Sequence, residues 1–217
     1  MTGCNNLSKG TAIGAAGGAA LGAIVGKIAG NTVVGAAVGT AVGAGTGALI
    51  GRHMDKVKVQ AEAVANAQVE SYTDAHGLQG VKVTFDSGIL FPSSSSTLQP
   101  TAMTSLTQFA NNVLKVNPDC DVAVQGYTDN DAWKNSTAEQ SIQKNLDLSQ
   151  QRAQAVTSYL LSLGVAGSQI RSTTGFGESN PVADNSTAAG KAKNRRVEVI
   201  LYASEAMIQK AEAGTLQ

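Results

Sequence analysis

Residues 121–164 read DVAVQGYTDNDAWKNSTAEQSIQKNLDLSQQRAQAVTSYLLSLG and contain three successive patterns. The run from Asp121 to Tyr127 is apolar enough to form a buried strand. The residues from Thr128 to about Leu148 are polar, which indicates a loop. Apolar residues then recur at helical spacing until Gly164, and they are Ala153, Val156, Leu160 and Leu163. The stretch therefore predicts a strand, a long loop and an amphipathic helix.

Strand and helix patterns alternate on both sides of this stretch. Val81 to Phe85 alternates apolar with polar residues, as a half-buried strand does. A helix begins near Pro100, because proline is favoured in a first helical turn, and it ends before Asn117-Pro118. Two further strands are expected at Ile170 to Phe176 and at Arg196 to Tyr202. The order βαβαββ predicts an α+β fold of two layers, with two helices on one face of a sheet.

Five motifs occur in order along this region. They are Phe85-Asp86-Ser87-Gly88-Ile89-Leu90-Phe91, Gly126-Tyr127-Thr128-Asp129, Asn145 with Leu148-Ser149-Gln150-Gln151-Arg152-Ala153, Gly175-Phe176-Gly177-Glu178-Ser179-Asn180-Pro181, and Asn194-Arg195-Arg196-Val197-Glu198. Together they resemble the OmpA C-terminal domain, which is shared with Pal and the flagellar stator proteins. The resemblance covers residues 66–203 and implies an OmpA-like fold there.

The resemblance also implies a ligand, the peptide stem of peptidoglycan, bound through its diaminopimelate residue or an equivalent diamino acid. Such a zwitterionic group offers an ammonium and a carboxylate. By resemblance, Asp129 takes the ammonium and Arg152 grips the carboxylate, which its planar guanidinium can do with two hydrogen bonds. We also expect Arg152 in the first turn of its helix, where free backbone N–H groups favour an anion.

Other residues of the motifs have two open roles. Asn145, Asn194, Arg195 and Arg196 either contact the ligand or brace the loops, the arginines by pairing with Asp86 or Glu198. Asp86 likewise either contacts the ligand or caps a turn. From these we select Asn145, Asp86, Asn194 and Arg196 as further candidate ligand-binding residues.

The sequence departs from the usual family pattern around the candidate site. Tyr127 stands where many relatives have histidine. After Asp129 the chain continues with residues 130–133, Asn-Asp-Ala-Trp, and 22 residues separate Asp129 from Arg152, more than is usual. Trp133, the one tryptophan of the chain, either stacks on a sugar or covers apolar surface, and we favour the second role.

Glycine recurs every fourth residue near the N-terminus, at positions 10, 14, 18, 22, 26 and 30 and again at 35, 39, 43, 47 and 51. On a helix this spacing places the glycines on one face, where two backbones can approach closely. The break at Gly30-Asn31-Thr32 favours a turn. Residues 10–51 therefore resemble a glycine-zipper helical hairpin of an outer-membrane lipoprotein; the alternative is a flexible linker.

The remaining segments complete the domain plan. Residues 1–9 form a tether in which Thr2-Gly3-Cys4 resembles the end of a lipobox, so we expect a lipid on Cys4 and most of a signal peptide upstream. Residues 52–71 have the stripe of a connecting helix that carries the next domain away from the membrane. Residues 204–217 resemble a short amphipathic helix.

Composition argues against several classes of function. Sixteen basic and sixteen acidic residues cancel, and no lysine or arginine run offers a phosphate-binding patch, so we expect no nucleic-acid partner. His53 and His76 are isolated, and no nucleophile motif or phosphate loop is present, so we expect no metal, no cofactor and no enzyme.

The sequence predicts a peptidoglycan-binding protein that tethers the outer membrane to the wall from the periplasm. The alternative is an envelope assembly protein whose hairpin forms homo-oligomers and whose OmpA-like domain mainly contacts other proteins.

Overall fold

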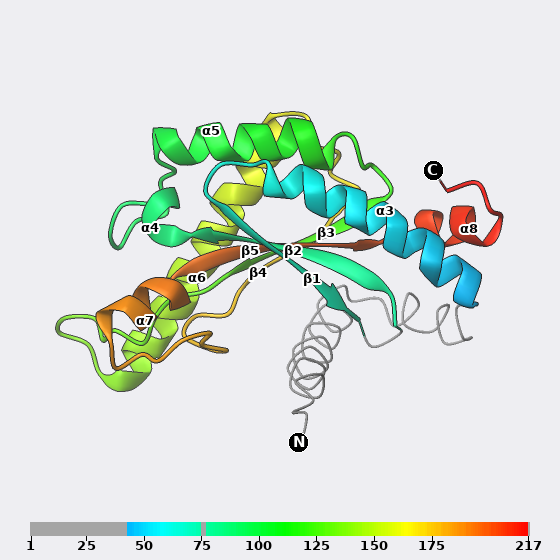
Figure 1. The fold of residues 1–217 in the computed structure, drawn as a ribbon. Coiled ribbons are helices and arrows are strands. Elements are labelled where there is room, and N and C mark those ends of the chain that lie inside the picture. The colour runs from blue at the N-terminus through cyan, green and yellow to red at the C-terminus, as the bar shows by residue number, and fades with distance from the viewer. Residues whose placement is uncertain (1–42, 75–76, 217) are drawn as a thin grey trace, which may run out of the picture.

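The computed structural model describes residues 43–74 and 77–216. Figure 1 shows a sheet with helices packed against it, and the labels used below are those of the figure. The strands are β1 (Ala67–Thr73), β2 (Gln79–Asp86), β3 (Cys120–Gly126), β4 (Ile170–Gly175) and β5 (Arg196–Ala203). The helices are α3 (Ala44–Glu62), α4 (Ser87–Leu90), α5 (Pro100–Phe109), a π-helical continuation of α5 (Ala110–Leu114), α6 (Ala138–Ser162), α7 (Ala188–Asn194) and α8 (Glu205–Glu212).

The five strands form one sheet in the order β1-β2-β5-β3-β4. The last strand of the chain, β5, lies in the middle and pairs antiparallel with both β2 and β3. β3 and β4 are parallel neighbours joined through α6, which is the usual way to connect parallel strands. The predicted α+β fold with its βαβαββ order is confirmed, with β1 as an additional edge strand.

The core lies between the sheet and the helices. Buried apolar side chains of α3, α5 and α6 pack with those of β2, β3 and β5 in one cluster, in which Phe85 meets Phe109 edge to face with ring centroids 5.7 Å apart. In Figure 1, α3 and α5 lie side by side along the same side of the sheet. α8 adds Met207, Ile208 and Ala211 to the cluster, so the amphipathic helix predicted for the C-terminal tail is confirmed.

The predicted connecting helix over residues 52–71 is wrong in its end. α3 ends at Glu62, and Asn66 adopts a left-handed conformation with a φ of 61°, which stops a helix. The residues that follow form β1, which pairs antiparallel with β2 from Ala67 opposite Phe85 to Thr73 opposite Gln79. α3 is part of the core, since Ile50, Met54 and Val57 are fully buried.

The predicted loop from Thr128 to about Leu148 is also wrong over its second half. α6 begins at Ala138 after a capping box, in which Thr137 and Gln140 bind each other's backbone N–H groups at 3.3 and 3.0 Å. Two extra turns of helix therefore precede Asn145. Arg152 lies in the middle of α6, so the expected contribution of free N–H groups at a helix start is absent at this position.

The predictions for the N-terminal part fall almost entirely outside the described residues. Cys4 and the glycine hairpin up to residue 42 are not described, whereas Gly47 and Gly51 belong to α3. Within the described ranges, no helix has both the length and the apolar character needed to cross a membrane.

Candidate functional site

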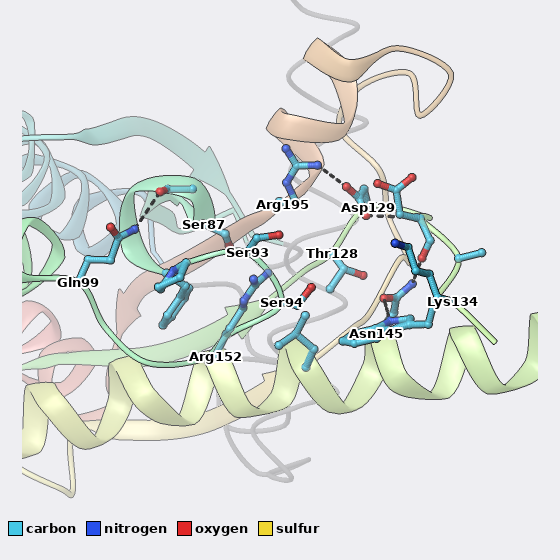
Figure 2. A pocket seen from close by; sticks show the side chains of 17 residues that line it. Ser87, Ser93, Ser94, Gln99, Thr128, Asp129, Lys134, Asn145, Arg152 and Arg195 are labelled. Atoms are coloured by element: carbon cyan, nitrogen blue, oxygen red, sulfur yellow. Dashed lines mark hydrogen bonds and ion pairs between the residues drawn. The ribbon is translucent and has the colours of Figure 1, made fainter. Parts of the chain in front are cut away.

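A pocket of about 730 Å³ opens where β3 ends and β5 begins. Four segments line it: α4 with the loop that follows, the loop after β3, the middle of α6, and Arg195 just before β5. Figure 2 shows side chains of these segments directed toward one another. The lining residues are Ser87, Gly88, Phe91, Pro92, Ser93, Ser94, Gln99, Thr128, Asp129, Asp131, Ala132, Trp133, Lys134, Asn145, Leu148, Arg152 and Arg195.

Backbone hydrogen bonds hold three of these segments together. The N–H of Tyr127 donates to the Arg196 carbonyl at 2.9 Å, which continues the pairing of β3 with β5 beyond Gly126. The N–H of Ser87 donates to the Arg195 carbonyl at 2.9 Å. The start of α4, the loop after β3 and the entry to β5 are therefore fixed at one edge of the sheet.

Asp129 lies at the pocket wall with only 5% of its surface exposed. Its Oδ2 accepts a hydrogen bond from Nη1 of Arg195, and the two residues form an ion pair (Figure 2). Its Oδ1 accepts from the N–H of Asp131 at 3.2 Å. The carboxylate is thus oriented from two sides.

Arg152 is buried in the same pocket, with 4% of its surface exposed. Its Nε donates to the Ser95 carbonyl at 3.0 Å, and its guanidinium lies over the Phe91 ring, 5.3 Å from the ring centroid. Burial, followed by the nearby Arg195 charge, lowers the pKa of Arg152 to about 10, so the side chain stays cationic at neutral pH. Within the described part of the chain, this bond from Nε is the one hydrogen bond of the guanidinium.

Asn145 organises the long loop after β3. Its Oδ1 accepts from Nε1 of Trp133 at 2.8 Å, and its Nδ2 donates to the Asp131 carbonyl and to Glu178, both at 3.2 Å. The N–H of Trp133 donates to Ser141 at 3.0 Å. Asn145 lines the pocket as predicted, but its polar atoms are occupied by the protein, and Trp133 forms one wall of the pocket.

Three predicted ligand-binding residues lie outside the pocket lining. Asp86 caps α4 by accepting from the N–H of Gly88 at 2.6 Å. Asn194 is fully buried, and its Oδ1 accepts the N–H groups of residues 182 and 183 at 2.8 and 2.9 Å. Arg196 pairs with Glu198 at 2.6 Å and lies 3.7 Å from the centroid of the Tyr127 ring. These contacts match the bracing role, which the sequence had left open.

The part of the sequence that forms most of this pocket matches a known family. Residues 90–195 match the OmpA family, and residues 13–58 match the glycine zipper family. A solved structure described as the cell wall anchor of the T6SS from Pseudomonas aeruginosa is 30% identical, and the similarity covers 70% of this chain and 97% of that one with a TM-score of 0.53. The chain belongs to the OmpA family.

Two curated relatives match part of the chain. The probable lipoprotein YiaD of Escherichia coli is 50% identical over 113 residues, which are 52% of this chain and 47% of that protein. The peptidoglycan-binding protein ArfA of Mycobacterium tuberculosis is 42% identical over 113 residues, which are 52% of this chain and 32% of that protein. The chain thus spans about half or less of the length of these two relatives.

Sequence reasoning missed three polar groups of this OmpA-family pocket. Arg195 had been left with two open roles, and its guanidinium is the partner of Asp129. The hydroxyls of Ser87 and Thr128 are buried in the lining, with 1% and 4% of the residues exposed, and have no hydrogen-bond partner in the described part of the chain. The sequence did hold a signal for Arg195. Side chains alternate between the two faces of a strand, so Arg196 and Glu198 lie on one face and Arg195 must point to the other.

Proposed function

We propose that the OmpA domain binds peptidoglycan without covalent attachment, through the zwitterionic end of a diaminopimelate-type stem peptide. One observation carries the proposal: the carboxylate of Asp129 and the guanidinium of Arg152 line one pocket without forming an ion pair with each other. An ammonium and a carboxylate on one carbon atom fit such a site, because each charge of the ligand meets its opposite.

The unpartnered groups of the pocket add to this fit. Both Nη atoms of Arg152 can grip a carboxylate, and charge-assisted bonds of this kind contribute about 1.5–3 kcal/mol. The hydroxyls of Ser87 and Thr128 are buried beside the pocket without a hydrogen-bond partner among the described residues, and leaving a buried polar group unpaired costs about 1–3 kcal/mol. The name of the mycobacterial relative, a peptidoglycan-binding protein, supports the same ligand class.

The proposed activity is binding without catalysis. Asp129 is engaged by Arg195, and the other carboxylate of the lining, Asp131, is paired with Lys191 at 2.6 Å. Arg152, although its pKa is lowered, remains protonated and cannot act as a base at neutral pH. The charged groups are therefore arranged to hold a ligand.

The domain tethers the outer membrane to the cell wall from the periplasm. The match of residues 13–58 to the glycine zipper family and the lipobox-like Thr2-Gly3-Cys4 support a membrane end, held by a lipid on Cys4, by packed glycine helices or by both. The name of the Escherichia coli relative, a probable lipoprotein, agrees with this. Mass spectrometry of the protein made with its native upstream sequence should find acylated Cys4. An unmodified soluble product would show that Cys4 carries no lipid.

Co-sedimentation of the full chain with purified sacculi tests the wall end. Wild type should sediment, whereas Asp129→Asn and Arg152→Gln should remain in the supernatant. Arg171→Gln is the control, because it removes the charge of an arginine that pairs with a buried aspartate, Asp121, and lies outside the lining. Equal sedimentation of all four proteins would show that the pocket is not the peptidoglycan site.

A further inference from the structure

The lining of the pocket carries more positive charge than a zwitterion needs. Three basic residues of the lining, Lys134, Arg152 and Arg195, stand against two acidic ones, Asp129 and Asp131. Asp131 is already paired with Lys191, which lies outside the lining. Asp129 is therefore left as the one lining carboxylate for the three basic residues, and its ion pair is with Arg195.

The second guanidinium is close enough to the first for their charges to interact. Arg195 lowers the pKa of Arg152, as a neighbouring cation does, and Asp129 opposes that effect. A zwitterionic ligand end adds one positive and one negative charge, so the positive excess of the lining remains after binding. In a pocket with partly buried walls such an excess is costly, because the effective dielectric constant is lower than in water.

The backbone at Arg195 is fixed, whereas its side chain is accessible. The residue's N–H donates to the Lys191 carbonyl at 3.0 Å, and its carbonyl accepts from Ser87 at 2.9 Å. The side chain is 38% exposed, and among the described residues it pairs with Asp129 through Nη1. Figure 2 shows its side chain linked to Asp129, with Arg152 below both in the view. The remaining donors of Arg195 can therefore reach a ligand group at the pocket mouth.

We infer that Arg195 binds a second carboxylate of the ligand, so that the pocket selects a group with one ammonium and two carboxylates over one with a single carboxylate. This inference rests on the proposed function and specifies its ligand. A stem peptide can supply the second carboxylate from two sources, its C-terminal carboxyl group or the free α-carboxyl group of a γ-linked glutamate. Conversion of that carboxylate to an amide then weakens binding without touching the zwitterionic end.

Isothermal titration of the full chain with soluble peptides tests the inference. The probes are L-alanyl-γ-D-glutamyl-meso-diaminopimelate, its amide at the glutamyl α-carboxyl group, and its amide at the C-terminal carboxyl group. Wild type should bind one of the two amides about tenfold or more weakly than the acid, as expected for loss of one charge-assisted bond. The amide that loses affinity identifies which carboxylate Arg195 contacts.

Variants at Arg195 separate ligand contact from support of Asp129. Arg195→Gln should bind the acid and that amide equally, Arg195→Lys should keep part of the preference, and Arg171→Gln should keep all of it. A preference that persists in Arg195→Gln, or wild type binding all three peptides equally, overturns the inference and leaves the proposed function standing. Failure of wild type to bind even the acid overturns both.

Discussion

The carbonyl oxygen of Ser149 lies so close to Gly126 that a Cβ atom at position 126 would stand 2.2 Å from it. The last residue of β3 therefore touches the backbone of α6 directly. Arg152 follows Ser149 by less than one turn of the helix, so this contact fixes how far its guanidinium reaches into the pocket. The absence of a side chain at position 126 sets the distance between the two elements.

Replacement of Gly126 by alanine should destabilise the protein. The added methyl group has to push α6 away from the sheet, and overpacking of this kind costs about 1–3 kcal/mol. Urea unfolding should show a lower free energy of unfolding. Gly167→Ala is the control, because a Cβ there meets only the end of Leu161 at 3.9 Å, and its change should stay within about 0.5 kcal/mol. Equal effects of the two substitutions would contradict the proposed close contact.

Arg196 should prove to be a structural residue. It is 4% exposed and paired with Glu198, which is 2% exposed, so Arg196→Met leaves a buried carboxylate without its main partner. We expect a loss of about 3–5 kcal/mol in the free energy of unfolding. The double variant Arg196→Met with Glu198→Leu should recover much of this loss. If the single variant kept full stability and lost only peptidoglycan binding, Arg196 would be a ligand residue after all.

Trp133 offers an optical test of the long loop. It is the sole tryptophan, it lines the pocket, and its indole N–H is held by Asn145. Asn145→Ala should release the ring toward solvent and shift the fluorescence emission to longer wavelength. Gln143→Ala, which removes an exposed contact with Asp147 on the same helix, should leave the spectrum unchanged. An unchanged spectrum in Asn145→Ala would mean that the hydrogen bond does not hold the loop.

Asp121 should make stability fall between about pH 4 and pH 6. Burial raises the pKa of this carboxyl to about 6, although Arg171 opposes the shift. Because the folded pKa lies above the unfolded one, the native state binds more protons in this window and loses stability as pH rises through it. Asp121→Asn should remove this component, so the stability of the variant relative to wild type should increase from pH 4 to pH 7. If the free energies of unfolding of the two proteins changed in parallel with pH, the raised pKa of Asp121 would be contradicted.

The order of strands and helices was predictable because apolar residues mark it. The beginning of α6 was not, because its buried stripe there is formed by polar residues, Ser141, Asn145 and Ser149, which hydrophobic periodicity cannot detect. β1 was missed for a related reason. As an edge strand with exposed Gln68 and Glu70 around a partly buried Val69, it shows little apolar alternation and follows an alanine-rich helix.

The candidate site was predictable only in part. The shared pocket of Asp129 and Arg152 follows from the motifs. That Arg195 lines the pocket whereas Arg196 pairs with Glu198 depends on the direction in which each side chain leaves the backbone at the start of β5. Tyr127, the departure from the family's histidine, proves to be buried between Arg196 and Phe176 and lies outside the lining. That substitution therefore leaves the pocket wall unchanged.

A crystal structure of the full chain with meso-diaminopimelate measures the central claim most directly. One ammonium of the ligand should lie about 2.7–3.2 Å from an Oδ atom of Asp129, and the carboxylate on the same carbon should accept hydrogen bonds from the Nη atoms of Arg152. Ligand density away from this pocket, or in the pocket without contacts to both residues, would contradict the account.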